Sequence, residues 1–302
     1  MADETCAAPP EDRRDSQPGP PPGLVLVSTP IGNLGDVTSR ARDTLAAANL
    51  ILCEDTRHTA RLLSAIGVNV KTQPLHEHNE DARIPAVLAM LRAGQRIALV
   101  SDAGTPLVSD PGYRLVRAAI AEDLPVTAAP GPNAAVTALV LSGLPPQPFL
   151  FLGFPPPRQA ARRAAFGTLR AAERAGLAAT LIWHEAPHRL AETLADMQTA
   201  FGDRPAAVAR ELTKHFEEVR RGPLADLAAH YTVTGPRGEI TVLVGPPEAE
   251  DPEDLDGQLR RAMTDNSVKD AAALVAAATG LPRRVVYARA LALSRKDGET
   301  DD

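Results

Sequence analysis

The chain has 302 residues, more than one hydrophobic core usually supports, so two domains are expected. A composition of 44% hydrophobic and 23% charged residues is that of an ordinary globular protein, and a formal net charge of −6 argues against a surface covered with cations for nucleic acid. Aromatic residues are scarce at 3%, which leaves few rings for stacking on bases. No apolar run approaches the ~18 residues of a membrane span.

The cysteines and the N-terminus indicate the compartment. Cys6 lies in a polar tail and Cys53 ends an apolar strand, so the two do not suggest a disulfide framework. The acidic, proline-rich N-terminus is unlike a secretory signal. We therefore expect a cytoplasmic protein without a membrane segment.

Residues 1–22 lack periodicity and apolar content, and we expect a disordered tail there. Over residues 23–145 apolar strands alternate with helical patterns, which predicts a parallel sheet with right-handed crossovers. The strands are expected at 24–27, 50–53, 70–75, 97–100 and 125–128, and the helices at 38–48, 59–66, 81–92, 113–121 and 130–141.

Residues 143–157 have the composition of a connection between domains. Beyond them the alternation is less regular and predicts a second α/β domain over 146–247, followed by a helical appendage within 248–302 that opens with an acidic linker at 248–256. The helices are expected at 159–175, 187–201, 224–230, 268–278 and 282–293, and the strands at 179–183, 206–210, 216–220 and 239–244.

The stretch Ile97–Gly112 (IALVSDAGTPLVSDPG) organises the first domain. A buried strand stops at a run of small residues and a proline, which permits a sharp turn and leaves room for a ligand near the backbone. Ligands of open α/β sheets bind outside the carboxyl ends of the strands. The first loop, TPIGNLGD, lacks the glycine fingerprints of nicotinamide and P-loop sites, and taken alone it is a plain turn between a strand and a helix.

Polar groups follow two further strands. Residues 54–58 (EDTRH) place two acids, a cation and an imidazole at a strand end, where like charges raise one pKa, and they are candidates for proton transfer; the alternative is a helix N-cap. Residues 76–80 (HEHNE) contain metal-ligand types, but no other cluster completes a coordination shell, so we expect polar substrate contact or a solvated loop and no metal.

Two stretches are rich in arginine. Grouped cations bind phosphates by releasing counterions, although a solvated helix face is the commoner alternative. The members are Arg158, Arg162, Arg163, Arg170 and Arg174, and then Arg283, Arg284, Arg289, Arg295 and Lys296.

Eight stretches together resemble one family. In chain order over about residues 23–245 they are STPIGNLGDVTSRA, CEDTRHT, LHEHNE, ALVSDAGTPLVSDPGYRLV, PGPNAAVTAL, GFPPP, ARELTK and GEITVLV. In these stretches the chain is similar to the small-subunit ribosomal RNA cytidine 2′-O-methyltransferases of the tetrapyrrole methylase superfamily, which use S-adenosylmethionine. Residues 267–293 also resemble the helical appendage that many members carry.

The resemblance implies two α/β domains of the tetrapyrrole methylase type with a cleft between them, in a homodimer. The cofactor would lie in that cleft, held by backbone and small side chains. Carried over by position, the cofactor-binding residues are Pro30, Asp102, Gly104, Thr105, Pro106, Val108, Ala134, Ala135, Leu212 and Gly238.

The reaction implied is methyl transfer to a ribose 2′-hydroxyl, which must be aligned with the methyl–sulfur bond and lose a proton. We expect Glu54, Asp55 and His58 to form the acid–base set, with Arg57 and Lys214 binding phosphate or the hydroxyl oxygen. The expected substrate contacts are His76, His78 and Asn79, with the phosphate footprint on Arg158, Arg162, Arg163, Arg283 and Arg284.

The expected substrate is small-subunit ribosomal RNA within an assembled subunit rather than naked RNA. Two alternatives stay open at this point. One is a methyltransferase acting on a tetrapyrrole carbon, and the other is a non-catalytic RNA-binding assembly factor whose helical C-terminus does the binding.

Overall fold

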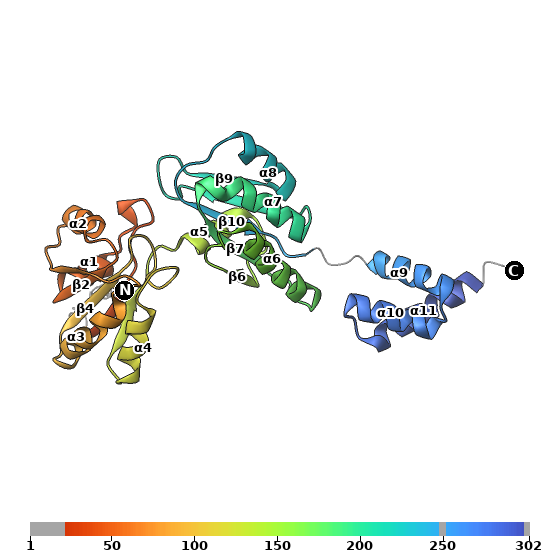
Figure 1. Cartoon of the computed structure of the whole chain (residues 1–302), viewed down its shortest axis with the longest axis horizontal. Helices are drawn as coiled ribbons and strands as arrows, with labels where there is room; N and C mark the ends of the chain where they lie inside the picture. Colours follow the sequence, from red (N-terminus) through yellow and green to blue (C-terminus); the bar gives the residue numbers. More distant parts are fainter. Residues whose placement is uncertain (1–21, 248–251, 299–302) are drawn as a thin grey trace, which may run out of the picture. The chain divides into compact units, whose positions relative to one another are not determined.

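The computed structural model describes residues 22–247 and 252–298, so the expected N-terminal tail, with Cys6, lies almost entirely outside the described residues. Contacts divide the chain into two compact units, one ending at Pro132 and one beginning at Asn133 (Figure 1). Within the described ranges, no helix is both long enough and apolar enough to cross a membrane.

The first unit contains a parallel sheet of five strands in the order β3-β2-β4-β1-β5, as the alternating pattern predicts. The strands are β1 (Gly23–Val27), β2 (Leu50–Cys53), β3 (Thr72–Pro74), β4 (Arg96–Val100) and β5 (Val126–Ala129). The intervening helices are η1 (Leu34–Asp36), α1 (Ser39–Ala46), α2 (Thr56–Ala65), α3 (Glu80–Arg92) and α4 (Tyr113–Ala121). Because all the strands run in one direction, their carboxyl ends share one edge of the sheet.

Strands β1, β2 and β4 are buried on both faces of the sheet, which explains why they are nearly continuous apolar runs. Leu24, Leu52 and Leu99 pack on one face with apolar residues of α3 and α4. Val27, Cys53 and Val100 pack on the other face with residues of α1 and α2. The Cys53 thiol is free and buried.

The second unit contains a mixed sheet in the order β6-β7-β10-β8-β9. Only the β6–β7 pair is parallel, while β7–β10, β10–β8 and β8–β9 are antiparallel, which explains why the alternation of strands and helices is irregular here. The strands are β6 (Phe149–Phe151), β7 (Thr180–Glu185), β8 (Pro205–Arg210), β9 (Glu218–Pro223) and β10 (Ile240–Val244). The helices are α5 (Ala134–Ser142), α6 (Gln159–Arg174), η2 (Pro187–Arg189), α7 (Leu190–Phe201) and α8 (Leu224–Val233).

Two expectations about the middle of the chain differ from the structure. Residues 143–157 are not simply a connection, because β6 lies within them and pairs with β7. Helix α5, which the sequence analysis places with the first domain, packs on strands β7, β8 and β10 of the second sheet. Its buried residues Ala135, Ala138 and Leu139 are small or apolar enough to cover that sheet.

Three helices form the C-terminal part: α9 (Pro252–Asp265), α10 (Val268–Thr279) and α11 (Arg283–Gly298). The expected acidic linker at 248–256 is therefore wrong from Pro252 onward, where a helix begins; residues 248–251 lie outside the described residues. The break at Gly280 is confirmed, since this glycine ends α10 with a φ of 71°. Leu259, Val275 and Val286 share the small core of the three helices.

Buried ion pairs tie the helices of the second unit together. Arg162 on α6 is fully buried and donates from Nε to Asp196 Oδ2 on α7 at 2.7 Å. Arg163 donates from Nε to the other carboxylate oxygen of Asp196 at 2.6 Å, and its side chain remains half exposed. The placement of Arg162 in the phosphate footprint is therefore wrong, because its guanidinium is sealed inside the unit and occupied by Asp196.

This ion pair yields a stability prediction. Arg162→Leu leaves the buried Asp196 without its buried partner, and removing one member of such a pair typically costs about 3–5 kcal/mol. We expect the urea midpoint of the second unit to fall accordingly. The matched variant Arg163→Leu, at a half-exposed position, should cost about 1 kcal/mol or less. Equal losses in the two variants would contradict the assignment.

Candidate active site

The loops after β1, β4 and β5 are joined at the carboxyl edge of the first sheet. Thr29 donates its backbone N–H to the Gly104 carbonyl at 2.8 Å, and Gly104 returns the bond to Thr29 at 3.1 Å. The Ser28 hydroxyl donates to the Thr105 hydroxyl at 3.3 Å, and Thr105 donates to the Pro132 carbonyl at 3.2 Å. Three segments distant in sequence thus form one continuous floor.

Glycine is required at two positions of the β4 loop. Gly104 has a φ of 77°, and a Cβ there would lie 3.3 Å from Ile31 and 3.6 Å from the Pro132 carbonyl oxygen. Gly112 has a φ of 118°, and a Cβ there would lie 2.5 Å from a methyl group of Leu99. Both backbones lie in a conformation that side chains disfavour, and at Gly112 a side chain would also overlap Leu99, so glycine is strongly preferred at both positions.

The predicted cofactor residues fall into two groups. Pro30 follows β1, and the β4 loop carries Asp102, Gly104, Thr105, Pro106 and Val108, so these six lie on the floor or beside it. The other four belong to the second unit. They are Ala134 and Ala135 in the first turn of α5, Leu212 after β8 and Gly238 before β10.

Asp55 has a structural task. It is the N-cap of α2, where its Oδ1 accepts the backbone N–H of Arg57 at 2.7 Å and that of His58 at 3.4 Å. These hydrogen bonds to the ionised form lower the pKa of Asp55. Its own backbone N–H donates to Asp102 Oδ1 at 3.2 Å, which ties the β2 loop to the β4 loop. The helix-cap alternative thus applies to Asp55.

Glu54 behaves differently from its neighbour. Partial desolvation and then the carboxylate of Asp102 raise the pKa of Glu54, and the nearby His76 opposes the rise. The repulsion expected between two adjacent acids is therefore present, but Asp102 contributes more of it than Asp55 does. Arg57 and His58 are exposed in the first turn of α2.

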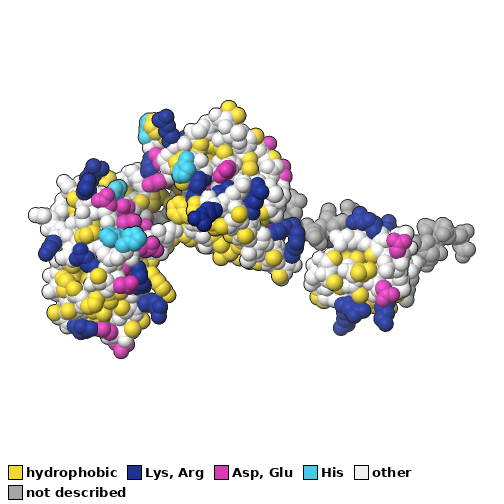
Figure 2. Space-filling view, in the orientation of Figure 1, with side chains coloured by type: hydrophobic (Ala, Val, Ile, Leu, Met, Phe, Trp, Pro, Cys, Tyr) yellow, Lys and Arg dark blue, Asp and Glu magenta, His cyan; other side chains and the backbone are white. Residues whose placement is uncertain are grey.

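Asp110 is a site residue that the sequence analysis does not name. Burial, followed by the negative charges of Glu54 and Asp102, raises its pKa to about 7. The only signal for it in the sequence is its place in the turn Asp110-Pro111-Gly112 at the end of the Ile97–Gly112 stretch, which does not distinguish a site residue from an ordinary turn residue. Glu54, Asp102 and Asp110 therefore form one electrostatically coupled carboxylate group at this edge of the sheet. Figure 2 shows acidic side chains and histidines gathered on the face of the first unit that it presents.

The loop after β3 is held by its own side chains. Asn79 Oδ1 accepts the backbone N–H of His76 at 2.9 Å, and Asn79 Nδ2 donates to the Pro74 carbonyl at 3.2 Å. The same amide group lies 3.0 Å from His76 Nε2. Asn79 is thus a structural clamp, while His78 is exposed with its ring centre 6.1 Å from that of His76.

Arg114, at the start of α4, connects this loop to the β4 loop. It donates to the Glu77 carbonyl at 2.7 Å and to Asp81 at 2.6 Å. The buried Glu80 accepts the backbone N–H of Leu115 at 2.9 Å. These bonds fix the beginning of α3 against the beginning of α4.

In the second unit, Lys214 belongs to an ion-paired loop. Its Nζ donates to Glu211 at 2.8 Å and to Glu239 at 3.1 Å. Burial opposes the charged form, but the two carboxylates outweigh it and raise the pKa of Lys214. Lys214 therefore stays protonated and can act as a cation but not as a proton acceptor.

Gly238 supports the same loop. A Cβ there would lie 2.1 Å from Glu211 Oε1, so the missing side chain makes room for that carboxylate. The same Glu211 oxygen accepts the backbone N–H of Glu239 at 3.0 Å. Gly238 is thus required locally by Glu211, in addition to the cofactor contact that the resemblance implies.

The remaining predicted phosphate contacts lie on helix surfaces. Arg158 precedes α6 and is exposed, whereas Arg170 donates to Glu173 at 3.2 Å. Arg283 and Arg284 begin α11 and are exposed. Among the described residues, no group of three or more His, Cys, Asp or Glu side chains is arranged to hold a metal ion.

The arrangement can perform two tasks. A floor of backbone amides, glycine and small hydroxyl side chains lets a ligand approach the main chain closely, which fits a cofactor held by backbone and small side chains. A carboxylate group beside that floor, with one pKa near neutrality, can accept a proton at physiological pH.

Two family models match the sequence. The model described as Tetrapyrrole (Corrin/Porphyrin) Methylases matches residues 23–228, and the model described as RsmI C-terminal HTH domain matches residues 249–294. The first runs from β1 into α8, and the second covers α9, α10 and most of α11.

Curated relatives match nearly the whole chain. A protein named Ribosomal RNA small subunit methyltransferase I from Mesorhizobium japonicum is 48% identical over 93% of this chain and 95% of its own length. A protein of the same name from Escherichia coli O157:H7 is 42% identical over 89% of this chain and 94% of its own length.

Solved structures share the fold at low identity. The cobalamin biosynthetic enzyme cobalt precorrin-4 methyltransferase matches with a TM-score of 0.56 at 16% identity, over 74% of this chain and 94% of that one. Uroporphyrin-III C-methyltransferase from Thermus thermophilus, solved with S-adenyl homocysteine, matches with a TM-score of 0.51 at 18% identity, over 74% of this chain and 97% of that one. The expected fold class and the resemblance noted in the sequence motifs are both confirmed. The chain therefore belongs to the tetrapyrrole methylase family and, within it, to the ribosomal RNA small subunit methyltransferase I group.

Proposed function

We propose that this protein transfers a methyl group from S-adenosylmethionine to the ribose 2′-hydroxyl of a cytidine in small-subunit ribosomal RNA. The observation that carries the proposal is the coupled group Glu54, Asp102 and Asp110 beside the floor of the first unit. It supplies the proton acceptor that this reaction needs, in a chain whose relatives are named for ribosomal RNA methylation. The substrate form proposed is the assembled small subunit in the cytoplasm, and the enzyme form proposed is a homodimer.

The residues proposed to hold the cofactor are those that the family resemblance names. In the first unit the backbone at Gly104 and the small side chain of Thr105 would support it beside Asp102. In the second unit the proposed contacts are Ala134, Ala135, Leu212 and Gly238. When bound, S-adenosylmethionine supplies an electrophilic methyl group on a positively charged sulfur.

We assign the acceptance of the ribose hydroxyl proton to Glu54 and Asp110. A general base works best when its pKa lies near the working pH, and both carboxyls have pKa values shifted upward, that of Asp110 to about 7. Asp55 is assigned a positioning role instead, because its carboxylate caps α2 and its pKa is lowered. His58, in the first turn of α2, is kept in the proposed acid–base set.

The substrate contacts proposed come from both units. Arg57 and Lys214 are assigned to phosphate or to the hydroxyl oxygen, and His76 and His78 to the nucleotide, with Asn79 holding the loop that carries them. Phosphates further along the RNA are assigned to Arg158, Arg163, Arg283 and Arg284. An A-form helix leaves little room for in-line attack, so an unpaired, splayed nucleotide is the expected target.

The proposal is tested by supplying methyl-labelled S-adenosylmethionine with small subunits that lack the modification. We expect label in the RNA at one cytidine, whose 2′-O-methyl group makes the following phosphodiester resistant to alkali. Label in an added tetrapyrrole and none in the RNA would overturn the proposal. So would the absence of transfer together with no thermal shift on adding S-adenosylmethionine, because a ligand that binds the folded state must stabilise it.

Removing the proposed proton acceptors should slow turnover without weakening cofactor binding. For Glu54→Gln and Asp110→Asn we expect kcat to fall by roughly 10²–10⁴ in at least one variant, the usual contribution of a general base. Calorimetry should give an unchanged Kd for S-adenosylmethionine. Asp123→Asn changes an exposed acid before β5, at the opposite edge of the sheet, and should retain full turnover.

The pH dependence of turnover should report the coupled carboxyls. Proton acceptance requires the ionised form, so kcat/KM should rise with pH through a midpoint near the Asp110 pKa of about 7. Asp102→Asn removes a negative charge that raises the pKa values of both Glu54 and Asp110, so this midpoint should move to lower pH. The amide oxygen can still accept the Asp55 N–H. An unmoved or raised midpoint would contradict the coupling.

A further inference from the structure

Helix α2 presents a group of basic side chains directly after strand β2. Its sequence, TRHTARLLSA, contains no acidic residue. Thr59 and Leu63 are its buried residues. Arg57, His58 and Arg61 are exposed. These three positions fall within an arc of about 100° around the helix axis, so they form one surface, which we call the α2 cationic face.

This face is unfavourable for the helix itself. Arg57 and Arg61 lie four residues apart, about 6 Å along the axis, and like charges at this spacing destabilise a helix. A cation is also disfavoured in the first turn, where Arg57 lies, because the helix dipole is positive there. The N-cap Asp55 offsets part of this, since the backbone N–H of Arg57 and, less strongly, the charges of Arg57 and His58 lower the pKa of Asp55. Helix stability therefore does not account for the second arginine.

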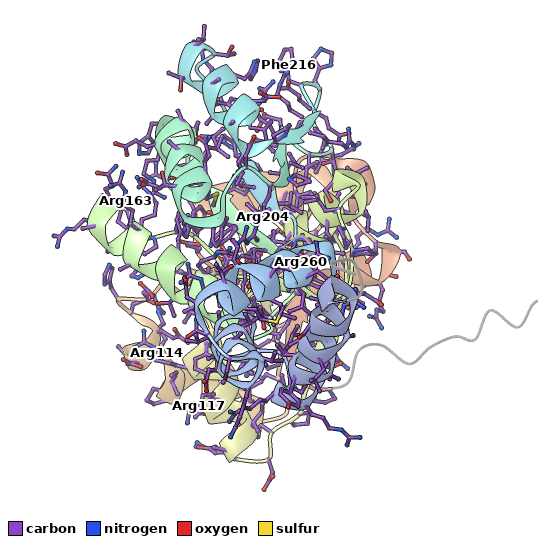
Figure 3. The ribbon with its side chains drawn as sticks, turned by 90° about the vertical axis from the view of Figure 1, so that its right-hand side faces the viewer. Arg114, Arg117, Arg163, Arg204, Phe216 and Arg260 are labelled. Atoms are coloured by element: carbon purple, nitrogen blue, oxygen red, sulfur yellow. The ribbon has the colours of Figure 1, made fainter. Side chains whose placement is uncertain are left out.

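The guanidinium groups of Arg57 and Arg61 are unengaged. Neither donates a hydrogen bond or forms an ion pair within residues 22–247 and 252–298. Other arginines of the first unit are held by neighbouring groups, including Arg114 and Arg117 on α4, which Figure 3 labels. The pairs are Arg40 with the Ala128 carbonyl, Arg42 with Asp43, Arg83 with Gln73, Arg92 with Glu122, Arg114 with the Glu77 carbonyl and Arg117 with the Tyr113 ring. In the described part of this unit, two arginines on one helix face are thus left available for a ligand.

The acidic residues of the site explain why such a face is needed. Glu54 immediately precedes the cap of α2, and the cap residue donates its N–H to Asp102. These carboxyls repel the phosphates that flank a target nucleotide, so RNA can bind beside them only where cations neutralise its charge. The planar guanidinium fork of arginine matches the geometry of phosphate. We propose that the α2 cationic face binds successive phosphates of the substrate RNA beside the methylated nucleotide, with Arg61 extending the contact assigned to Arg57.

The inference rests on the proposed function for the identity of the RNA. An acidic protein partner is a weaker explanation of the two arginines, because specific protein interfaces contain an apolar core. Beyond Arg61 the exposed face of α2 continues into Ser64 and Ala65, without a large apolar side chain. A charged face with small neighbouring residues suits a phosphate backbone better than a protein surface.

The test measures binding of the full chain to unmodified small subunits at several salt concentrations. Each phosphate contact on single-stranded RNA contributes roughly 0.7 to the slope of log K against log salt, which corresponds to about 5-fold in affinity at 0.1 M relative to 1 M salt. Arg57→Gln and Arg61→Gln should each lower the slope by about this amount and raise Kd at 0.1 M salt roughly 5-fold. Arg61→Lys keeps the charge and should retain the wild-type slope.

Arg117→Gln is the matched control, since it removes the same charge from an exposed position on another helix of the first unit. It should leave the slope unchanged. Arg61→Gln should melt at the wild-type temperature or slightly above it, because the repulsion from Arg57 is relieved. An unchanged slope in the Arg57→Gln/Arg61→Gln double variant overturns the proposal. So does an equal fall in Arg117→Gln, which would mark a general effect of net charge.

Two further measurements separate the partner and the activity. The change in slope should also appear with small-subunit RNA freed of its proteins, and a change seen only with intact subunits would assign the face to a protein and overturn the proposal. Methyl transfer by the wild type is measured on the same subunits. Transfer with an unchanged slope in the double variant refutes the α2 cationic face alone, whereas a lowered slope without transfer refutes the proposed function and leaves the RNA surface standing.

Discussion

Two backbone hydrogen bonds between Thr29 and Gly104 fix the geometry on which the candidate site depends. They join the loops after the first and fourth strands, and the hydroxyl chain from Ser28 through Thr105 extends the connection to Pro132 after the fifth. Because the partner in the β4 loop is a glycine with a positive φ, the two main chains approach without an intervening side chain. The order of the parallel strands brings these loops together.

The carboxyl groups beside this floor have different pKa values because their surroundings differ. Asp55 is exposed and accepts backbone N–H groups, so its charge is stabilised, whereas Asp110 is partly desolvated near two other acids and its charge is disfavoured. The same contrast holds in the second unit, where two carboxylates keep Lys214 charged against the effect of burial. The first unit thus contains a carboxyl group that can exchange a proton near neutral pH, and the second unit contains a lysine that stays charged.

The sequence predicts the first sheet well because its three central strands, β1, β2 and β4, are nearly continuous apolar runs and its loops carry turn residues. It predicts the second sheet less well, because the three-residue strand Phe149–Phe151 is too short to show a pattern and antiparallel pairing does not require alternating helices. Motif positions locate the floor, but pKa values depend on distances between strand ends. Asp110 therefore cannot be identified from its motif alone. Arg162 is one of several arginines on an amphipathic helix, and its burial becomes evident only from its contact with Asp196 on the neighbouring helix.

Arg114 has a consequence for how the first unit can recognise a partner. By holding the Glu77 carbonyl and Asp81 from the first turn of α4, it joins the histidine-bearing segment after β3 to the turn that carries Asp110. The buried Glu80 reinforces the joint through the Leu115 amide. These bonds join the two segments into one preformed surface, so a ligand that binds there would meet a fixed shape and would itself have to adjust.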